Sequence, residues 1–337
     1  MIYMDNAATT RLSSRALEAM MPYLTEQYAN PAGTYSFTNA SNAAMVKARK
    51  QVADVIGAKS AEIFFTSGGT ESDNWALKGV MRANEKKGRH LIISAIEHHA
   101  ILHSAKALER EGFDVTVLPV DADGVVAPEA VEAAIRPDTV LVSIMAANNE
   151  IGTIEPLEAI GEVCKRHGVV FHTDAVQAFG KLDTKPERKK IDLMSISAHK
   201  IHGPKGVGAL YVRKGIRIQP HSFGGGQERG IRPGTEALPA IGGFGAAVEA
   251  LPAVGESLKH AQELAAACRE KLRALPGVAL NSPEDALPYI VNFSAGAVRA
   301  ETMLHFLAAR GVYVSSGSAC SKGKQSPVLE AMQLPKE

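Results

Sequence analysis

The sequence predicts an α/β protein built on a mostly parallel sheet. Between about residue 40 and residue 215, short apolar runs with the composition of strands alternate with helix-like stretches. This repeated strand-loop-helix order, with short connections, places successive strands in parallel and helices on both faces of the sheet. After Gly224-Gly225-Gly226 the pattern changes to a long alanine-rich region followed by short strands. That change predicts a second, smaller α/β unit.

Each apolar run of the first unit ends at a polar or glycine-rich segment, as strands of an α/β sheet do. The candidate strands are residues 63–65, 91–93, 115–118, 140–145, 169–173, 191–196 and 207–212. Helical patterns follow the first four of these strands and run to Val80, Glu111, Ile135 and His167. In the second unit we expect a helical region over 235–275 that is broken near Pro252, a strand at 289–293, a helix at 300–310 and a strand at 312–314.

The length of 337 residues is ample for two hydrophobic cores. We expect a large domain over residues 15–245. The small domain is expected to combine residues 1–14 with residues 246–337 and to carry a cysteine-containing loop, residues 315–324.

Composition excludes several classes of protein. The net charge is +1, with basic and acidic residues mixed along the chain, so nothing favours binding to nucleic acid or to an anionic membrane. Residues 1–5 lack a basic region followed by an apolar run, so we expect no signal peptide. The three cysteines, Cys164, Cys268 and Cys320, are far apart in the sequence. They suit a reducing cytoplasm and not a disulfide framework or a structural zinc site.

A polar, glycine-rich break separates the predicted strands 191–196 and 207–212. Ser197, His199 and Lys200 fall where the first of these strands should end, and α/β proteins place their chemistry at strand ends and in the loops that follow. A lysine that is half-shielded there loses its proton more easily and can form a Schiff base with an aldehyde. The alternative is that Lys200 is a solvated loop lysine, since lysine is mostly exposed.

Residues 67–72, Ser-Gly-Gly-Thr-Glu-Ser, lie between a predicted strand and a predicted helix. Glycines such as Gly69 let the backbone approach a ligand closely, and the helix N-terminus near Thr70 offers free N–H groups and the positive end of a dipole. The segment is therefore a candidate phosphate site, although it is not a Walker sequence. The alternative is a plain helix cap made by Ser67 or Thr70.

Asp174 directly follows the predicted strand 169–173. A carboxylate at the mouth of a buried strand needs a partner. A protonated heterocyclic nitrogen, a nearby lysine or a helix cap would each serve, and Gln177 could add a neutral hydrogen bond from the same loop.

Histidines also follow a predicted strand. His98 could stack flat against an aromatic ligand. His99 and His103 are four residues apart on a helix, which is one metal-ligand spacing. No acidic residue completes a zinc motif between them and the cysteines are remote, so we predict no metal site. A zinc hydrolase that uses these two histidines remains an alternative.

Residues 315–324 form a loop of small residues in which Cys320 stands among lysines. Loops of this kind are exposed, and nearby ammonium groups favour the nucleophilic thiolate. The alternative is an incidental surface cysteine. Cys164 and Cys268 lie inside amphipathic helical patterns and are expected to be small core residues.

Short segments in a fixed order carry a family resemblance over nearly the whole chain. They are residues 3–10, 66–74, 97–99, 148–152, 174–177, 197–200, 224–229, 232–235 and 316–320. Together they resemble the cysteine desulfurase family of the NifS/IscS type, which belongs to the pyridoxal-phosphate enzymes of aminotransferase fold type I. The resemblance implies a large domain with a seven-stranded, mostly parallel sheet and a smaller α/β domain.

The resemblance also implies roles for the site residues. Lys200 would hold pyridoxal 5'-phosphate as a Schiff base, and Asp174 would pair with the ring nitrogen and keep it protonated. His98 would stack on the ring and assist proton transfer. The other cofactor contacts implied are those of Gly69, Thr70, Asn149, Gln177, Ser197, His199 and Thr235. Thr235 would reach the phosphate bound by the partner subunit of a homodimer.

In this family Cys320 would attack the sulfur of the substrate and become a persulfide. The implied reaction converts L-cysteine to L-alanine and supplies sulfur to an acceptor or iron-sulfur scaffold protein, for iron-sulfur clusters or for thiolation of tRNA or cofactors. The implied location is the cytoplasm, with no direct nucleic-acid or membrane partner. The alternatives are a selenocysteine lyase or another fold type I enzyme, and a dimeric scaffold that binds the cofactor with little or no turnover.

Two features depart from the family pattern. The family continues beyond the cysteine loop with a tail whose arginine suits a substrate carboxylate, because its planar fork matches the carboxylate bidentately. This sequence has no arginine after Arg310, and Tyr35 stands where a histidine is expected. We therefore expect a complete cofactor site, a small domain shortened at its C-terminus and an incomplete substrate site with impaired activity.

Overall fold

The computed structural model describes residues 1–296, 298–317 and 326–334. Its central element is a seven-stranded sheet with the strand order β2-β8-β7-β6-β5-β3-β4. The strands are β2 (Ile63–Thr66), β3 (His90–Ser94), β4 (Asp114–Leu118), β5 (Thr139–Ser143), β6 (Val170–Asp174), β7 (Leu193–Ser197) and β8 (Gly208–Val212). Only β8 runs antiparallel to its neighbours, β2 and β7. The predicted α/β class with a mostly parallel sheet is confirmed.

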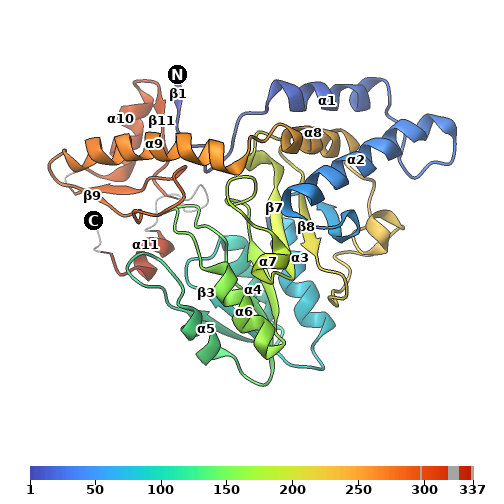
Figure 1. Ribbon diagram of the computed structural model, residues 1–337, viewed down its shortest axis with the longest axis horizontal. Helices are drawn as coiled ribbons and strands as arrows, with labels where there is room; N and C mark the ends of the chain where they lie inside the picture. The colour runs from blue at the N-terminus through green and yellow to red at the C-terminus, as the bar shows by residue number, and fades with distance from the viewer. Residues whose placement is uncertain (297, 318–325, 335–337) are drawn as a thin grey trace.

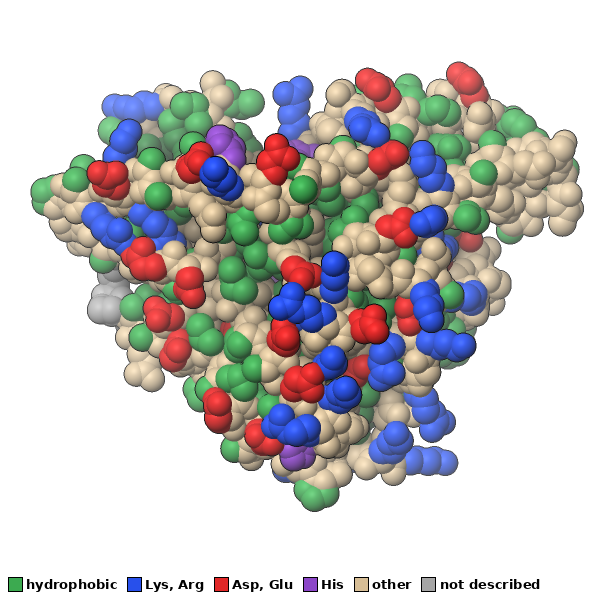
Figure 2. All heavy atoms as spheres, viewed as in Figure 1, with side chains coloured by type: hydrophobic (Ala, Val, Ile, Leu, Met, Phe, Trp, Pro, Cys, Tyr) green, Lys and Arg blue, Asp and Glu red, His purple; other side chains and the backbone are tan. Residues whose placement is uncertain are grey.

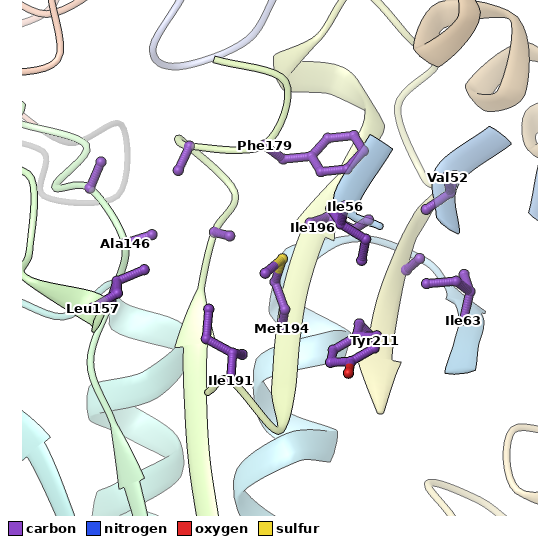
Figure 3. Close-up of a cluster of buried hydrophobic side chains, with 14 of the residues drawn as sticks. Val52, Ile56, Ile63, Ala146, Leu157, Phe179, Ile191, Met194, Ile196 and Tyr211 are labelled. Atoms are coloured by element: carbon purple, nitrogen blue, oxygen red, sulfur yellow. The ribbon is translucent and has the colours of Figure 1, made fainter. Parts of the chain in front are cut away.

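Helices cover both faces of this sheet (Figure 1). One face packs on α3 (Gly69–Ala83) and α4 (His99–Arg110). The other packs on α2 (Asn39–Ile56), α5 (Pro128–Ala134), α6 (Leu157–His167) and α8 (Leu238–Glu249). Neighbouring residues of a strand point to opposite faces, so Phe64 joins the first core and Phe65 the second. Figure 3 shows part of the second core, where Ile56 of α2 lies near Ile196 of β7.

Two further helices accompany the large sheet: α1 (Ser14–Thr25) packs on α8, and α7 (Pro186–Lys189) packs on α6. The remaining helices and strands form the smaller unit. They are β1 (Ile2–Tyr3), α9 (Val254–Arg273), β9 (Val278–Leu280), β10 (Phe293–Ala295), α10 (Ala300–Ala308), β11 (Val312–Tyr313) and α11 (Pro327–Ala331). β1 pairs in parallel with β11, and β9 pairs antiparallel with β10. The N-terminal strand therefore joins the last third of the chain, at the upper left of Figure 1. The domain boundaries at residues 14/15 and 245/246 stay a prediction.

Two expected elements differ in detail. The helical region expected over 235–275 is two helices, α8 and α9, bent by 79° around a break at 250–253. Pro252 explains the break, because proline cannot donate the helical hydrogen bond. The strand expected at 289–293 starts only at Phe293, since Pro288 and the Leu287 amide, which donates to the Gly152 carbonyl, hold the preceding segment away from a ladder.

The surface carries both signs of charge. Figure 2 shows lysine and arginine interspersed with aspartate and glutamate over the visible face, so this face has no large patch of a single sign. None of the helices in the described residues is by itself long and apolar enough to cross a bilayer; the bent pair α8 and α9 reaches that threshold only when taken together.

Candidate active site

A cavity of about 270 Å³ lies at the carboxyl ends of the parallel strands, where α/β proteins bind ligands. We refer to it as the site cavity. Its walls come from the ends of β6 and β7, the start of α3, the loops after β3 and β5, and the N-terminal segment. The lining residues are Asp5, Ala7, Ala8, Gly69, Thr70, Asp73, His98, Met145, Ala147, Asn149, Asp174, Val176, Gln177, Ser197, His199, Lys200, Ser315 and Gly317.

The site cavity thus brings together most of the residues singled out in the sequence. Gly69, Thr70, His98, Asn149, Asp174, Gln177, Ser197, His199 and Lys200 all line it. Thr235 does not line the cavity and is exposed. Cys320 lies outside the described residues, but Ser315 and Gly317 at the base of its loop line the cavity. The individual roles of these residues stay predictions.

The first turn of α3 faces the site cavity with backbone N–H groups that have no acceptor within the helix. The helix starts after Gly68, which has φ 145° and supplies no side-chain cap. The side chains of Ser67 and Thr70 therefore do not cap the helix, contrary to the plain-cap alternative. A Cβ on Gly69 would lie 2.7 Å from Val176 Cγ2, so glycine is needed for the close packing of α3 against the loop after β6. The free N–H groups and the dipole suit an anion.

Lys200 follows β7 on a short 3-10 turn, Ala198–Lys200. Its Nζ donates a hydrogen bond of 2.9 Å to the Ala8 carbonyl and a second one to the Ala7 carbonyl. The N-terminal segment therefore holds the lysine against the wall of the site cavity. Lys200 is half-buried and not a solvated loop lysine.

Asp174 ends β6 and is 5% exposed. Its Oδ1 accepts a hydrogen bond of 2.9 Å from the Val176 amide. Burial raises the pKa of Asp174, while the nearby His98 and Lys200 and the Val176 amide act in the opposite direction. A buried carboxylate of this kind is stabilised further by any cation placed in the cavity.

Hydrogen bonding at Nδ1 orients both histidines that line the cavity. His98 caps α4, with Nδ1 accepting a hydrogen bond of 3.2 Å from the Ala100 amide. Burial lowers the pKa of His98, so the neutral ring carries its proton on Nε2. His199 Nδ1 lies 3.1 Å from Thr9 Oγ1. Burial and the charge of Lys200 lower the pKa of His199 to about 4. Both rings are neutral at pH 7.

The helix that follows His98 gives no support to a zinc site. The His99 and His103 rings are 5.3 Å apart between centroids. Within the described parts of the chain, the group of three potential metal ligands is Asp73, His98 and Asp174, and neither His99 nor His103 belongs to it.

Two further site residues, Asp73 and Asp5, lie within the motif segments 66–74 and 3–10 but receive no role from the sequence. Asp73 is 1% exposed and lines the site cavity beside Asp174. The available signal was its spacing, since Asp73 follows Gly69 by four residues and so lies on the same face of α3. Asp5 also lines the cavity, because the pairing of β1 with β11 brings the N-terminus there.

Comparison with known proteins shows the family to which this chain belongs. A family model described as aminotransferase class-V matches residues 2–336. The cysteine desulfurase IscS of Methanosarcina thermophila is 48% identical over 340 residues, which cover 100% of this chain and 84% of that protein. The chain belongs to the cysteine desulfurase group of the class-V aminotransferases.

Further class-V aminotransferases agree with this assignment. The cysteine desulfurase IscS of Clostridium botulinum (strain Kyoto / Type A2) is 49% identical over 343 residues, 100% of this chain and 86% of that protein. A solved NifS-like protein has a TM-score of 0.94 at 42% identity and covers 99% of this chain and 90% of its own. A structure of SspA in complex with cysteine has a TM-score of 0.89 at 39% identity, covering 99% and 95%. The protein is therefore an enzyme of fold type I whose cofactor is pyridoxal phosphate.

The residues present fit this cofactor. The site cavity has an uncapped helix N-terminus at one wall, a buried carboxylate at another and a lysine between them. Gly69 permits the tight approach of α3 to Val176. Gln177 Nε2 donates to the Ala7 carbonyl at 2.8 Å, while its buried Oε1 has no hydrogen-bond partner among the described residues. An acceptor oxygen in that state suits a polar ligand in the cavity.

Proposed function

We propose that this protein is a cysteine desulfurase that converts L-cysteine to L-alanine and leaves the sulfur as a persulfide on Cys320. The observation that carries the proposal is that Lys200 and Asp174, the amine and the carboxylate this chemistry needs, line the same cavity. The names of the relatives agree with it, and one structural neighbour was solved in complex with cysteine.

When bound, pyridoxal phosphate supplies an electron sink that weakens bonds around the substrate's α-carbon. The N–H groups at the start of α3, with Thr70, Ser197 and His199, would bind its phosphate. Asp174 would hold the proton of its ring nitrogen, and Lys200 would hold its aldehyde carbon. His98, together with Val176 on the opposite side, would fix the plane of the ring.

Proton movement would fall to Lys200 and His98, which both line the cavity. With cofactor and substrate bound, the amine at Lys200 Nζ would take or return a proton at the substrate. The carbonyls of Ala7 and Ala8, which bind Nζ, would keep the released amine in reach. His98 carries its proton on Nε2 and can donate it to the substrate side of the cavity.

The sulfur step is assigned to Cys320. A thiolate attacks the substrate sulfur, the carbon–sulfur bond breaks, and the electron pair of that bond stays with the carbon fragment, which takes up protons to give alanine. The loop base at Ser315 and Gly317 lines the site cavity, which supports a cysteine carried between substrate and surface. The sulfur would pass to an acceptor or iron-sulfur scaffold protein in the cytoplasm.

A homodimer completes the proposed site. Thr235 is exposed and absent from the lining of its own subunit's site cavity, as a residue that binds the partner's phosphate would be. A second cavity of about 470 Å³ lies beside it, between α2 and residues 226–236. Large apolar side chains are exposed in the segments 28–37 and 223, which suits burial against a second copy: Tyr28, Tyr35, Phe37 and Phe223.

The test is to add L-cysteine to the cofactor-loaded enzyme and to measure alanine and protein-bound sulfur together. A desulfurase releases one alanine for each sulfur transferred. Alanine release from selenocysteine but not from cysteine would identify a lyase for selenocysteine instead. A bound cofactor that gives neither product would identify the dimeric scaffold and overturn the proposal.

A further inference from the structure

Asp73 lies beside Asp174, the carboxylate expected to bind the cofactor's ring nitrogen. It stands on α3 and is 1% exposed. One oxygen of Asp73, one oxygen of Asp174 and one ring nitrogen of His98 all lie within 4.8 Å of one another. Among the described residues, Asp73 Oδ1 has no hydrogen-bond partner. The motifs and the proposed reaction leave this buried carboxyl without a role.

The groups packed around Asp73 bring it no positive charge. On the β6 side, His172 Nε2 lies 3.9 Å from Asp73 Oδ1. Burial lowers the pKa of His172 to about 3, and its two nitrogens bind the hydroxyls of Ser143 and Ser195 at 2.8 and 3.0 Å. His172 is therefore neutral and does not balance a charge on Asp73.

The loop after β3 contributes another carboxyl group, that of Glu97, and not a positive charge that could balance Asp73. Burial raises the pKa of Glu97 to about 8, so this carboxyl is mostly protonated at pH 7. For Asp73, burial and then the negative charge of Asp174 raise the pKa well above its ordinary value, although a hydrogen bond with Ser195 acts in the opposite direction. Two adjacent buried carboxyls cannot both ionise, so the pair retains one proton.

The surroundings decide which of the two carboxyls keeps the proton. Asp174 receives the Val176 amide at 2.9 Å and faces His98 and Lys200 across the site cavity. Asp73 has a neutral histidine on one side, one unpartnered oxygen and only the hydroxyl of Ser195 as a neutral donor among the described residues. The negative charge is thus stabilised on Asp174, and the proton on Asp73.

We propose that Asp73 is a positioning residue: it keeps its proton, directs its O–H to Asp174 and so fixes the ionised Asp174 carboxylate opposite the cofactor's ring nitrogen. This inference rests on the cofactor site of the proposed function. It does not depend on which substrate the enzyme uses, since the O–H of Asp73 acts on Asp174 alone.

The test compares Asp73→Asn with Asp73→Ala. The asparagine amide still donates a hydrogen bond to Asp174, whereas alanine does not. Asp73→Ala removes a hydrogen bond to a charged group, and such bonds are stronger than those between neutral groups. We therefore expect pyridoxal phosphate to bind the cofactor-free Asp73→Ala protein about tenfold or more weakly. Asp73→Asn should stay within about twofold of the unchanged protein by the same measure. Equilibrium dialysis gives both values.

A second readout separates this role from a merely structural one. With ¹⁵N-labelled cofactor, the ring-nitrogen resonance should lose its proton at lower pH in Asp73→Ala than in Asp73→Asn. Equal binding and equal ring-nitrogen titration in both variants would overturn the inference, as would an asparagine variant as impaired as the alanine variant.

A measurement without substitutions guards against misfolded variants. In the cofactor-free protein, the carboxyl ¹³C resonance of Asp73 should keep the shift of a protonated acid at pH 7, and that of Asp174 should show an ionised one. The reverse pattern, or two ionised carboxyls, would overturn the inference. None of these measurements requires turnover. They therefore test the role of Asp73 even if the protein forms no alanine from cysteine and the proposed function fails.

Discussion

Arg232 binds Glu71 through two hydrogen bonds, 2.7 Å from Nε to Oε1 and 3.1 Å from Nη2 to Oε2. The pair ties the segment that carries Thr235 to the first turn of α3. Glu71 Oε2 also accepts a hydrogen bond of 2.9 Å from the Ser67 amide. One carboxylate therefore holds together two segments of the proposed phosphate site.

Acid should break this tie. Burial alone would raise the pKa of Glu71, but hydrogen bonds from Arg232 and Ser67 outweigh it and lower the pKa to about 2. A lowered pKa means stability that is fully present above pH 4.5 and is lost as the pH falls toward 2. Glu71→Gln should therefore remove on the order of 2–3 kcal/mol at pH 7 and flatten the loss below pH 4.5. Urea unfolding at several pH values measures both.

The exposed pair Lys50–Asp54 gives a matched control for that experiment. Asp54→Asn should change the free energy of unfolding by no more than about 0.5 kcal/mol, because exposed i,i+4 pairs contribute little. An unchanged acid profile in Glu71→Gln would show that the Arg232 contact does not stabilise the fold.

Lys200→Ala should abolish the covalently held cofactor, seen as loss of the lysine-dependent visible band. Alanine production should fall at least about a hundredfold, since the same amine also moves a proton. Lys205→Ala is the matched control, because Lys205 is exposed on the same loop and lies outside the site cavity. A normal band in Lys200→Ala would place the Schiff base on another lysine.

Gly69→Ala tests the close approach at the start of α3. Its Cβ would lie 2.7 Å from Val176 Cγ2, so either the helix start or the loop after β6 must shift. We expect cofactor affinity to fall about tenfold, the effect of roughly 1.4 kcal/mol. Gly255→Ala on α9, whose added Cβ meets nothing within 4 Å, should leave affinity unchanged. Equal affinities in the two variants would remove the packing argument.

Cys320→Ser should separate cofactor binding from sulfur transfer. The variant should keep the visible band and lose the persulfide, because a hydroxyl does not accept sulfur as a thiolate does. Cys268→Ser, which changes a half-buried cysteine, should retain both. Sulfur transfer that persists in Cys320→Ser would assign the acceptor to another cysteine.

Much of the fold and the site could be predicted from sequence because it depends on short, local patterns. Asp174 and Lys200 each follow an apolar run, and β6 and β7 are neighbours in the sheet. Parallel neighbours end at the same edge, so the two side chains meet there. The order of the motifs along the chain then indicates pyridoxal phosphate as the cofactor.

The rest depends on contacts between distant segments, which no local pattern encodes. The Ala8 carbonyl accepts a hydrogen bond from Lys200 across 192 positions of the sequence, and backbone bonds such as Thr10 N–H to the His199 carbonyl hold the two segments together. The role proposed for Asp73 is not visible in the sequence for another reason: its buried carboxyl meets that of Asp174 only when α3 packs on β6. The position of Cys320 cannot be compared, because it lies outside the described residues.

The most direct test is one turnover with ³⁴S-labelled L-cysteine, followed by mass spectrometry of the peptide that contains Cys320 and measurement of alanine. The account predicts alanine and one labelled sulfur atom on Cys320 in equal amounts. Labelled sulfide in solution with Cys320 unmodified, or a bound cofactor with no alanine, would contradict it.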